Sequence, residues 1–240
     1  GQAHVMLSRV EKLDQVFILE SFSEDKIRTS SKALAELNEM NKRSINANPI
    51  PWKQDNNKAL KIASLNCMNL LNSHEDILCD ETLMESSIIT FSETWLKEKD
   101  ELQISGYKAH FNSVGPGKGI AVYCKDSTFM PTLEIRHDTM QLTKLESKNL
   151  DIITVYRSEN GNTSQLLEHM ISMIKEETAT VILGDFNICY KTNKKNRISK
   201  FLETNGFKQF VDEPTHIRGR HIDHLYFKPS ESLNESPAIY

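Results

Sequence analysis

From residue 61 onward, the sequence repeats short runs of apolar and β-branched residues, and most of these runs end in a polar side chain. Runs of roughly four to eight such residues predict buried β-strands, and stretches with apolar residues at helical spacing predict helices. The expected strands are residues 62–65, 88–91, 119–123, 152–156, 180–183 and 222–227, and the expected helices are residues 73–86, 163–174 and 198–203. Because strands outnumber long helices, the pattern favours sheets covered by helices, in the α/β (α+β) class.

Residues 43–59 interrupt this pattern, because they are polar, aperiodic and contain Pro49 and Pro51. Such composition is typical of a linker. Residues 1–42 before it predict one strand and one helix of a small α/β piece. We therefore expect a fragment over residues 1–42, a linker over residues 43–59 and a larger domain over residues 60–240.

The bulk composition excludes several classes of protein. The four cysteines lie far apart and form no C-x-x-C pair, which argues against a thiolate zinc site and favours the nucleus or cytoplasm over secretion. No apolar run approaches the ~18 residues that a membrane span needs, so we expect no membrane contact. With a net charge of −4, any contact with nucleic acid must depend on local basic patches.

The polar residues at the strand ends are the candidates for chemistry. They are Asn66, Glu93, Tyr156 with Arg157, Asp185 with Asn187, and Asp223. Strand ends of α/β domains are where loops and ligands meet, although each residue taken alone is also an ordinary turn residue or helix cap.

Together these residue types suit phosphoryl chemistry. Asn66 and Glu93 offer oxygens to a hard cation such as Mg²⁺, which can polarise a phosphoryl oxygen. Asp185 and Asn187 are two apart, and we expect them on one side of an extended segment, where one orients water and the other donates to phosphate. Tyr156 would add a phenol and Arg157 a cation, and together they would form a clamp around the phosphate.

Six segments occur in an order that resembles the endonuclease/exonuclease/phosphatase superfamily, most closely its retrotransposon and apurinic-endonuclease-like branch. They are Ser-Leu-Asn at 64–66, Ser-Glu-Thr-Trp-Leu at 92–96, Gly-Lys-Gly-Ile-Ala-Val-Tyr at 117–123, Val-Tyr-Arg at 155–157, Ile-Leu-Gly-Asp-Phe-Asn at 182–187 and Ile-Asp-His at 222–224. The resemblance covers about residues 60–228. It implies a four-layer sandwich of two packed sheets flanked by helices. It also implies cleavage of a DNA phosphodiester by an activated water with Mg²⁺, or with Mn²⁺ in its place.

The resemblance further implies a role for each candidate residue. Asn66 and Glu93 match the metal-proximal pair, and Tyr156 matches the active-site tyrosine. Asp185 matches the residue that positions or activates the attacking water, and Asn187 matches the transition-state amide.

The pattern departs from the family after Asp223, which matches the buried acid that holds a catalytic histidine. In the family that histidine belongs to a Ser-Asp-His motif, and no such motif follows Asp223 here. His224 points to the opposite face of the strand and is a poor substitute. His216 and His221, in the preceding loop, either approach phosphate or are solvated. We therefore expect a domain that lacks its C-terminal end or has decayed, with weak or absent cleavage.

Basic residues near these motifs are candidates for phosphate contacts, which dominate sequence-independent DNA affinity. They are Lys118, Arg157, Lys194, Lys195, Arg197, Arg218 and Arg220. The alternative, a solvated charged loop, remains open for each cluster.

Residues 1–10 resemble the last motif of superfamily-one DNA helicases of the kind found in Helitron transposons. By that resemblance, Arg9 is the remnant of an arginine finger that reaches the γ-phosphate of ATP. The chain contains no G-x-x-x-x-G-K-[ST] loop, so we expect no ATP use from it alone.

Three hypotheses follow from these observations. The first is a DNA endonuclease from a transposon-derived helicase–nuclease polyprotein, which the basic loops favour. The second keeps the superfamily but changes the substrate to RNA or a phosphoinositide. The third is a non-catalytic remnant that binds nucleic acid, which the missing Ser-Asp-His motif favours.

Overall fold

The computed structural model describes residues 60–125, 127–192 and 197–231, which belong to one compact unit within Lys58–Ile239. The expectations for residues 1–42, for the linker at 43–59 and for Arg9, Lys194 and Lys195 fall outside these ranges. Within them, no helix is both long and apolar enough to cross a membrane.

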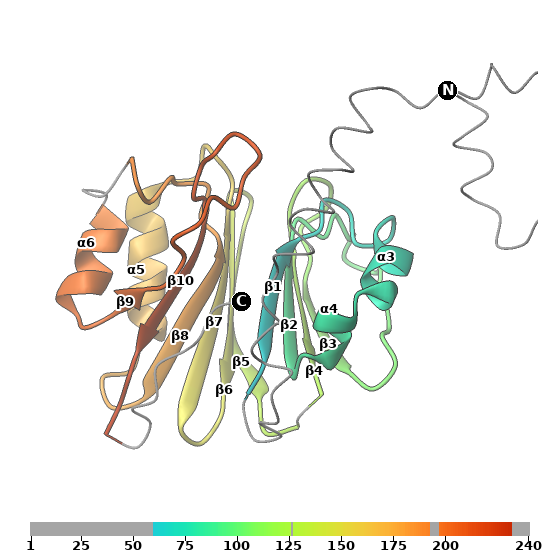
Figure 1. The fold of residues 1–240 in the computed structure, drawn as a ribbon, viewed down its shortest axis with the longest axis horizontal. Helices are drawn as coiled ribbons and strands as arrows, with labels where there is room; N and C mark the ends of the chain where they lie inside the picture. Colours follow the sequence, from blue (N-terminus) through green and yellow to red (C-terminus); the bar gives the residue numbers. More distant parts are fainter. Residues whose placement is uncertain (1–59, 126, 193–196, 232–240) are drawn as a thin grey trace, which may run out of the picture. The chain divides into compact units, whose positions relative to one another are not determined.

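The described strands form two sheets that pack face to face, with helices on their outer faces (Figure 1). One sheet has the order β1 (Ile62–Asn66), β2 (Ile88–Ser92), β4 (Ile120–Cys124), β3 (Lys108–Asn112). The other has the order β5 (Met130–His137), β6 (Met140–Glu146), β7 (Leu150–Arg157), β8 (Ala179–Asp185), β10 (Asp223–Lys228), β9 (Lys208–Gln209). Helices α3 (His74–Cys79) and α4 (Glu81–Glu85) cover the first sheet, and α5 (Thr163–Met173) and α6 (Arg197–Thr204) cover the second. The expected four-layer sandwich is confirmed.

The layers form because successive side chains of a strand point to opposite faces. In β4, Val122 packs between the two sheets, whereas its neighbour Tyr123 packs toward α3 and α4. In β7, Ile152 faces the other sheet and Ile153 faces α5 and α6. All four side chains are fully buried, and burying each large apolar side chain contributes roughly 1.5–3 kcal/mol. A run that is apolar on both faces therefore marks a central strand covered on both sides.

The strand register gathers the polar strand ends at one edge of the sandwich. Parallel pairing of β1 with β2 sets Asn66 beside Ser92, the residue before Glu93. In the other sheet, parallel pairing of β7 with β8 sets Tyr156 beside Asp185. Antiparallel pairing of β10 with β8 then sets Asp223 on the other side of Asp185.

Two helix predictions differ from the structure in detail. The single helix expected over residues 73–86 is two short helices, because Asp80 is extended (φ −83°, ψ 103°) and its side chain accepts a hydrogen bond from Leu83 N. Helix α5 begins at Thr163 as expected but ends at Met173, before the expected end, and Asn162 caps its start. The Asn162 side chain accepts from the main-chain nitrogens of Ser164 and Gln165, as N-cap residues do.

The sequence pattern does not predict four of the strands, because polar residues obscure the alternation of apolar side chains. These strands are β3, β5, β6 and β9. In β6, Thr143 and Lys144 are buried beside apolar neighbours. The Lys144 ammonium lies 2.9 Å from Asp151 Oδ2 and 2.7 Å from Glu146 Oε1. A buried lysine that is paired in this way is compatible with a core strand.

Gly184 allows β8 to approach β7 directly before Asp185. Its φ is +131°, and a Cβ atom at this position would lie 2.0 Å from the carbonyl oxygen of Val155. Only glycine tolerates both the dihedral and the contact.

We predict that Gly184→Ala lowers the free energy of unfolding by more than Gly206→Ala. Gly206 also has a positive φ (+84°), but a Cβ atom at this position would meet nothing within 4 Å. Both variants should lose about 1–2 kcal/mol from the dihedral. Only Gly184→Ala adds a steric overlap, which typically costs a further ~1–3 kcal/mol. Urea unfolding measures both, and equal losses would contradict the close approach.

Candidate active site

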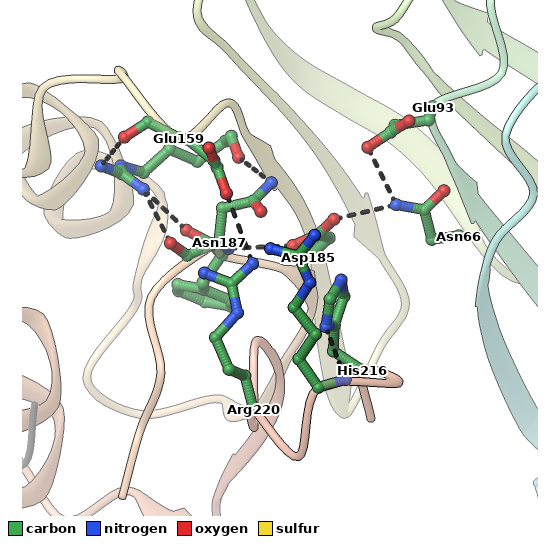
Figure 2. Close-up of polar contacts among 10 residues, drawn as sticks. Asn66, Glu93, Glu159, Asp185, Asn187, His216 and Arg220 are labelled. Carbon is green, nitrogen blue, oxygen red and sulfur yellow. Dashed lines mark hydrogen bonds and ion pairs between the residues drawn. The ribbon is translucent and has the colours of Figure 1, made fainter. Parts of the chain in front are cut away.

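The side-chain amide of Asn66 lies between two carboxylates from different sheets (Figure 2). Its Nδ2 donates to Glu93 Oε1 at 3.0 Å and to Asp185 Oδ2 at 2.9 Å. Its Oδ1 accepts from Met68 N at 3.2 Å, which orients the NH₂ group toward the carboxylates. The amide therefore joins the ends of β1, β2 and β8 at one point.

Backbone strain gathers in the loops around this point. Among the described non-glycine residues, positive φ values occur at Met68 (42°), Asn69 (96°), Glu93 (52°), Trp95 (58°) and Asn187 (50°). All five directly follow β1, β2 or β8. Such backbone conformations are uncommon in side-chain-bearing residues and concentrate at functional sites. The sequence pattern gave no signal of this strain.

Asp185 and Asn187 are not on one side of an extended segment, and that expectation is wrong. The chain turns at Asn187, whose main-chain nitrogen donates to Asp185 Oδ1 at 2.8 Å. The Asn187 side chain donates through Nδ2 to the carbonyl oxygen of Arg157 at 2.8 Å. A tight turn, rather than strand alternation, keeps both side chains at the site.

Arg157 does not belong to a phosphate clamp, which corrects a second expectation. Its guanidinium is buried and donates to the carbonyl oxygens of Gly161 (2.9 Å), Phe186 (3.0 Å) and Glu159 (3.0 Å). A fixed guanidinium with several donors is well suited to bind loop carbonyls. Arg157 therefore holds the turn that presents Asn187.

Tyr156 links the two sheets at the site. Its hydroxyl donates to the carbonyl oxygen of Gly117 at 2.9 Å, and its ring is buried. Burial, and then the negative charges of Glu93 and Asp185, raise the pKa of the phenol well above its usual range. The hydroxyl is therefore protonated and positions the loop around Gly117.

Three carboxylates, Glu93, Asp185 and Asp223, share the site, and none forms an ion pair with a described side chain. Burial, and then the negative charge of Asp223, raises the pKa of Asp185 to about 7, although hydrogen bonds from Asn187 and Asn66 oppose the rise. Burial also raises the pKa of Asp223, against a hydrogen bond with Thr215. Within the described residues, no lysine, arginine or histidine forms an ion pair with Glu93, Asp185 or Asp223.

This donor set fits a hard divalent cation. Glu93 and the Asn66 amide oxygen are ligands of the kind that Mg²⁺ prefers, and no lysine, arginine or histidine of the described ranges forms an ion pair with Glu93. No group of three or more His, Cys, Asp or Glu side chains in the described ranges has metal-site geometry. The set therefore suits a cation such as Mg²⁺, which keeps several waters and takes one or two carboxylates, and does not suit an all-protein cage.

The three histidines near Asp223 occupy different environments. His224 is buried, stacks on Phe186 and contacts Ile188 O through Nε2 at 2.7 Å, and burial lowers its pKa to about 4. His221 is also buried, contrary to a solvated loop position. His216 is partly exposed, and its positive charge when protonated lowers the pKa of Asp223. Of the three, His216 is therefore the one that belongs to the surface of the site.

The basic side chains expected to bind phosphate lie near this edge of the sandwich, and most of them form an ion pair or a hydrogen bond with another side chain. Lys118 pairs with Asp138, and Arg220 lies 3.4 Å from Glu159 (Figure 2). Arg218 is exposed in the same loop as His216, and Arg197 donates to Ser164 Oγ at the start of α5 at 3.0 Å.

Several solved structures match the fold of this domain. The endonuclease domain of TRAS1, a telomere-specific non-LTR retrotransposon, matches with a TM-score of 0.53 and 13% identity over 72% of this chain and 85% of that chain. An AP endonuclease from Archaeoglobus fulgidus matches with a TM-score of 0.53 and 15% identity over 71% and 87%. CdtB, the biologically active subunit of cytolethal distending toxin, matches with a TM-score of 0.52 and 13% identity over 74% and 87%.

No protein-family model matches the chain, and no curated protein matches it by sequence. The structural likeness nevertheless spans most of each solved chain. The domain therefore shares its fold with these solved proteins.

We predict a pH-dependent stability that Asp185→Asn removes. Because the pKa of Asp185 is raised to about 7 in the folded protein, its contribution to stability is full below about pH 4 and is lost as the pH rises through 7. The expected fall is a few kcal/mol, since each tenfold change in proton affinity corresponds to about 1.4 kcal/mol. Urea unfolding in EDTA between pH 4.5 and 8.5 measures it. A constant difference between wild type and Asp185→Asn over this range would contradict the raised pKa.

Proposed function

We propose that the domain is a Mg²⁺-dependent phosphodiesterase that cuts DNA. The observation that supports this most is the Asn66 amide, which holds Glu93 and Asp185 together at the edge where the two sheets meet. A carboxylate cluster without cationic partners, next to strained loops, is the arrangement expected of a site that binds a metal and a phosphate. Two of the solved proteins with this fold are named as endonucleases, which favours a nucleic-acid substrate.

Each residue has a task in this proposal. Glu93 and Asn66 Oδ1 would hold the cation, which when bound polarises a phosphoryl oxygen and stabilises the leaving oxyanion. Asp185 orients the attacking water and accepts its proton, for which a pKa of about 7 is well matched at neutral pH. Asn187 Nδ2 carries a second N–H beside the one bound to Arg157 O, and this second N–H donates to a phosphate oxygen.

Asp223 and His216 complete the site in part. His216 Nδ1 accepts a hydrogen bond from Arg218 N at 3.2 Å, so a neutral imidazole carries its proton on Nε2. His216 therefore donates to phosphate rather than accepting a proton from water.

The origin from a transposon-encoded helicase–nuclease remains part of the proposal. It rests on the resemblance of residues 1–10 to a Helitron-type helicase motif and on the order of the two resemblances in the chain. The DNA that flanks the coding region for residues 1–240 tests it. Helicase motifs in frame upstream would support this origin, and an unrelated upstream domain would contradict it.

We predict Mg²⁺-dependent nicking of supercoiled plasmid that is lost in Asp185→Asn and in Glu93→Gln. Each substitution replaces a carboxylate by an amide of the same size, which removes the negative charge and one acceptor oxygen. Lys175→Gln is the matched control, because Lys175 pairs with Glu146 at the opposite end of β6. Gel quantification of nicked circles over several hours measures the rate.

Two outcomes would overturn parts of this proposal. Nicking that is equal in wild type and Asp185→Asn would contradict a phosphodiesterase site and favour a nucleic-acid-binding remnant. Nicking that Asp185→Asn abolishes but Glu93→Gln leaves unchanged would confirm the role of Asp185 and contradict the role of Glu93 in holding the cation.

A further inference from the structure

A cavity of ≈ 330 Å³ lies beside the candidate site and has no part in the chemistry above. Its lining residues are Lys97, Glu98, Ser113, Val114, Gly115 and Arg136. They come from three segments: the loop after β2, the loop after β3 and the end of β5.

The register places this cavity at the same edge as the candidate site. Asn112, which ends β3, pairs with Ile120, and Ile120 pairs with Ser92 at the end of β2. The loop that begins at Glu93 reaches the cavity four residues later at Lys97, a span of at most about 14 Å. That distance corresponds to a few nucleotides of a bound strand.

The walls of the cavity are held by contacts between the sheets. The fully buried Asn112 side chain donates to the carbonyl oxygens of Ile135 and Leu142, both at 3.0 Å. Its Oδ1 accepts from Arg136 Nε at 3.3 Å. On the other side, Gly115 N donates to Leu96 O at 3.1 Å. The cavity is therefore part of the packed structure of the domain.

Two donor groups of the cavity, the Ser113 hydroxyl and the Lys97 ammonium, lack acceptors among the described residues. Ser113 is 6% exposed, and its buried hydroxyl has no hydrogen-bond partner. The two Nη atoms of Arg136 form only long ion pairs, 3.9 Å from Glu98 and 3.6 Å from Glu134, and make no hydrogen bond among the described residues. Among the described residues, none pairs with the Lys97 ammonium. An unpartnered buried hydroxyl costs about 1–3 kcal/mol, which a ligand with acceptor oxygens would offset.

We propose that Lys97, Ser113 and Arg136 form a subsite for a backbone phosphate of bound duplex DNA, a few nucleotides from the phosphate at Glu93 and Asp185. The subsite rests on the proposed function, because it gives the same substrate a second anchor. Two cations and a hydroxyl match the charge and the acceptor oxygens of a phosphodiester. Glu98 is 84% exposed, so solvent screens its opposing charge. Glu134, which is 29% exposed, lies nearer to Arg136 but also contacts His110 at 2.6 Å.

The test measures DNA affinity apart from cleavage. The full chain carrying Asp185→Asn is titrated with a fluorescent duplex of about 20 base pairs, without divalent cations, at several KCl concentrations. Arg136→Gln and Lys97→Gln are added separately to this parent, with Lys175→Gln as the charge-matched control. Each loss of a phosphate contact should reduce the slope of log K against log salt by about 0.9, and the control should leave it unchanged.

Ser113→Ala provides a second, independent readout. Because the hydroxyl is neutral, its loss should weaken binding roughly 2- to 10-fold with the salt slope unchanged. Because the hydroxyl is buried without a partner in the free protein, the variant should be at least as stable to urea as its parent. A destabilised Ser113→Ala variant would contradict the role of this hydroxyl.

Unchanged affinity and slope in both Arg136→Gln and Lys97→Gln would overturn the subsite, as would a parent that binds no duplex. Inorganic phosphate binding that these variants abolish, with DNA affinity unchanged, would overturn DNA as the ligand. Plasmid nicking by the chain without Asp185→Asn is scored separately. If the chain nicks plasmid but Arg136→Gln and Lys97→Gln leave the salt slope unchanged, the subsite alone is refuted. If these variants reduce the salt slope but the chain does not nick plasmid, the proposed enzymatic activity alone is refuted.

Discussion

The hydrogen bonds of the Asn66 amide are the contacts on which the rest of the site depends. β1 and β2 belong to one sheet and β8 to the other, so the face-to-face packing alone would leave Glu93 and Asp185 unrelated. The amide donates one N–H to each of them and is itself oriented through Met68 N. Tyr156 adds a second link, from β7 to Gly117. Side chains from the two sheets thereby form one surface with a defined arrangement of oxygens.

The clustered carboxylates and the strained loops of the site lower the stability of the domain. Asp185 is nearly fully buried, and Asp223 and Glu93 add negative charge around it without a cationic partner among the described side chains. The loops that carry these residues also hold five non-glycine residues at positive φ. Such features persist only where the surrounding structure fixes them, and here three buried apolar layers do so. A divalent cation bound at the site would offset this negative charge.

Sequence reasoning reached the fold through the strands that are apolar on both faces, such as β4 and β8, because their pattern reports burial directly. It missed β6, since a buried lysine that is neutralised by Asp151 reads as a surface residue. The strand-end rule named residues that the register does bring to one edge. It misjudged Arg157, because spacing does not tell whether a guanidinium faces solvent or the carbonyls of its own loop. The strained loops and the cavity at Ser113 arise from contacts between distant segments, which no local pattern encodes.

The most direct test of the account is to locate a divalent cation in a crystal of the wild-type chain grown with Mn²⁺. Anomalous scattering should show one ion within coordination distance of Glu93 and the Asn66 amide oxygen, at about 2.0–2.3 Å. The same peak should disappear in Glu93→Gln. An ion bound elsewhere, or none at millimolar Mn²⁺ in a crystal with this fold, would contradict a metal-dependent phosphodiesterase site at the Asn66 bridge.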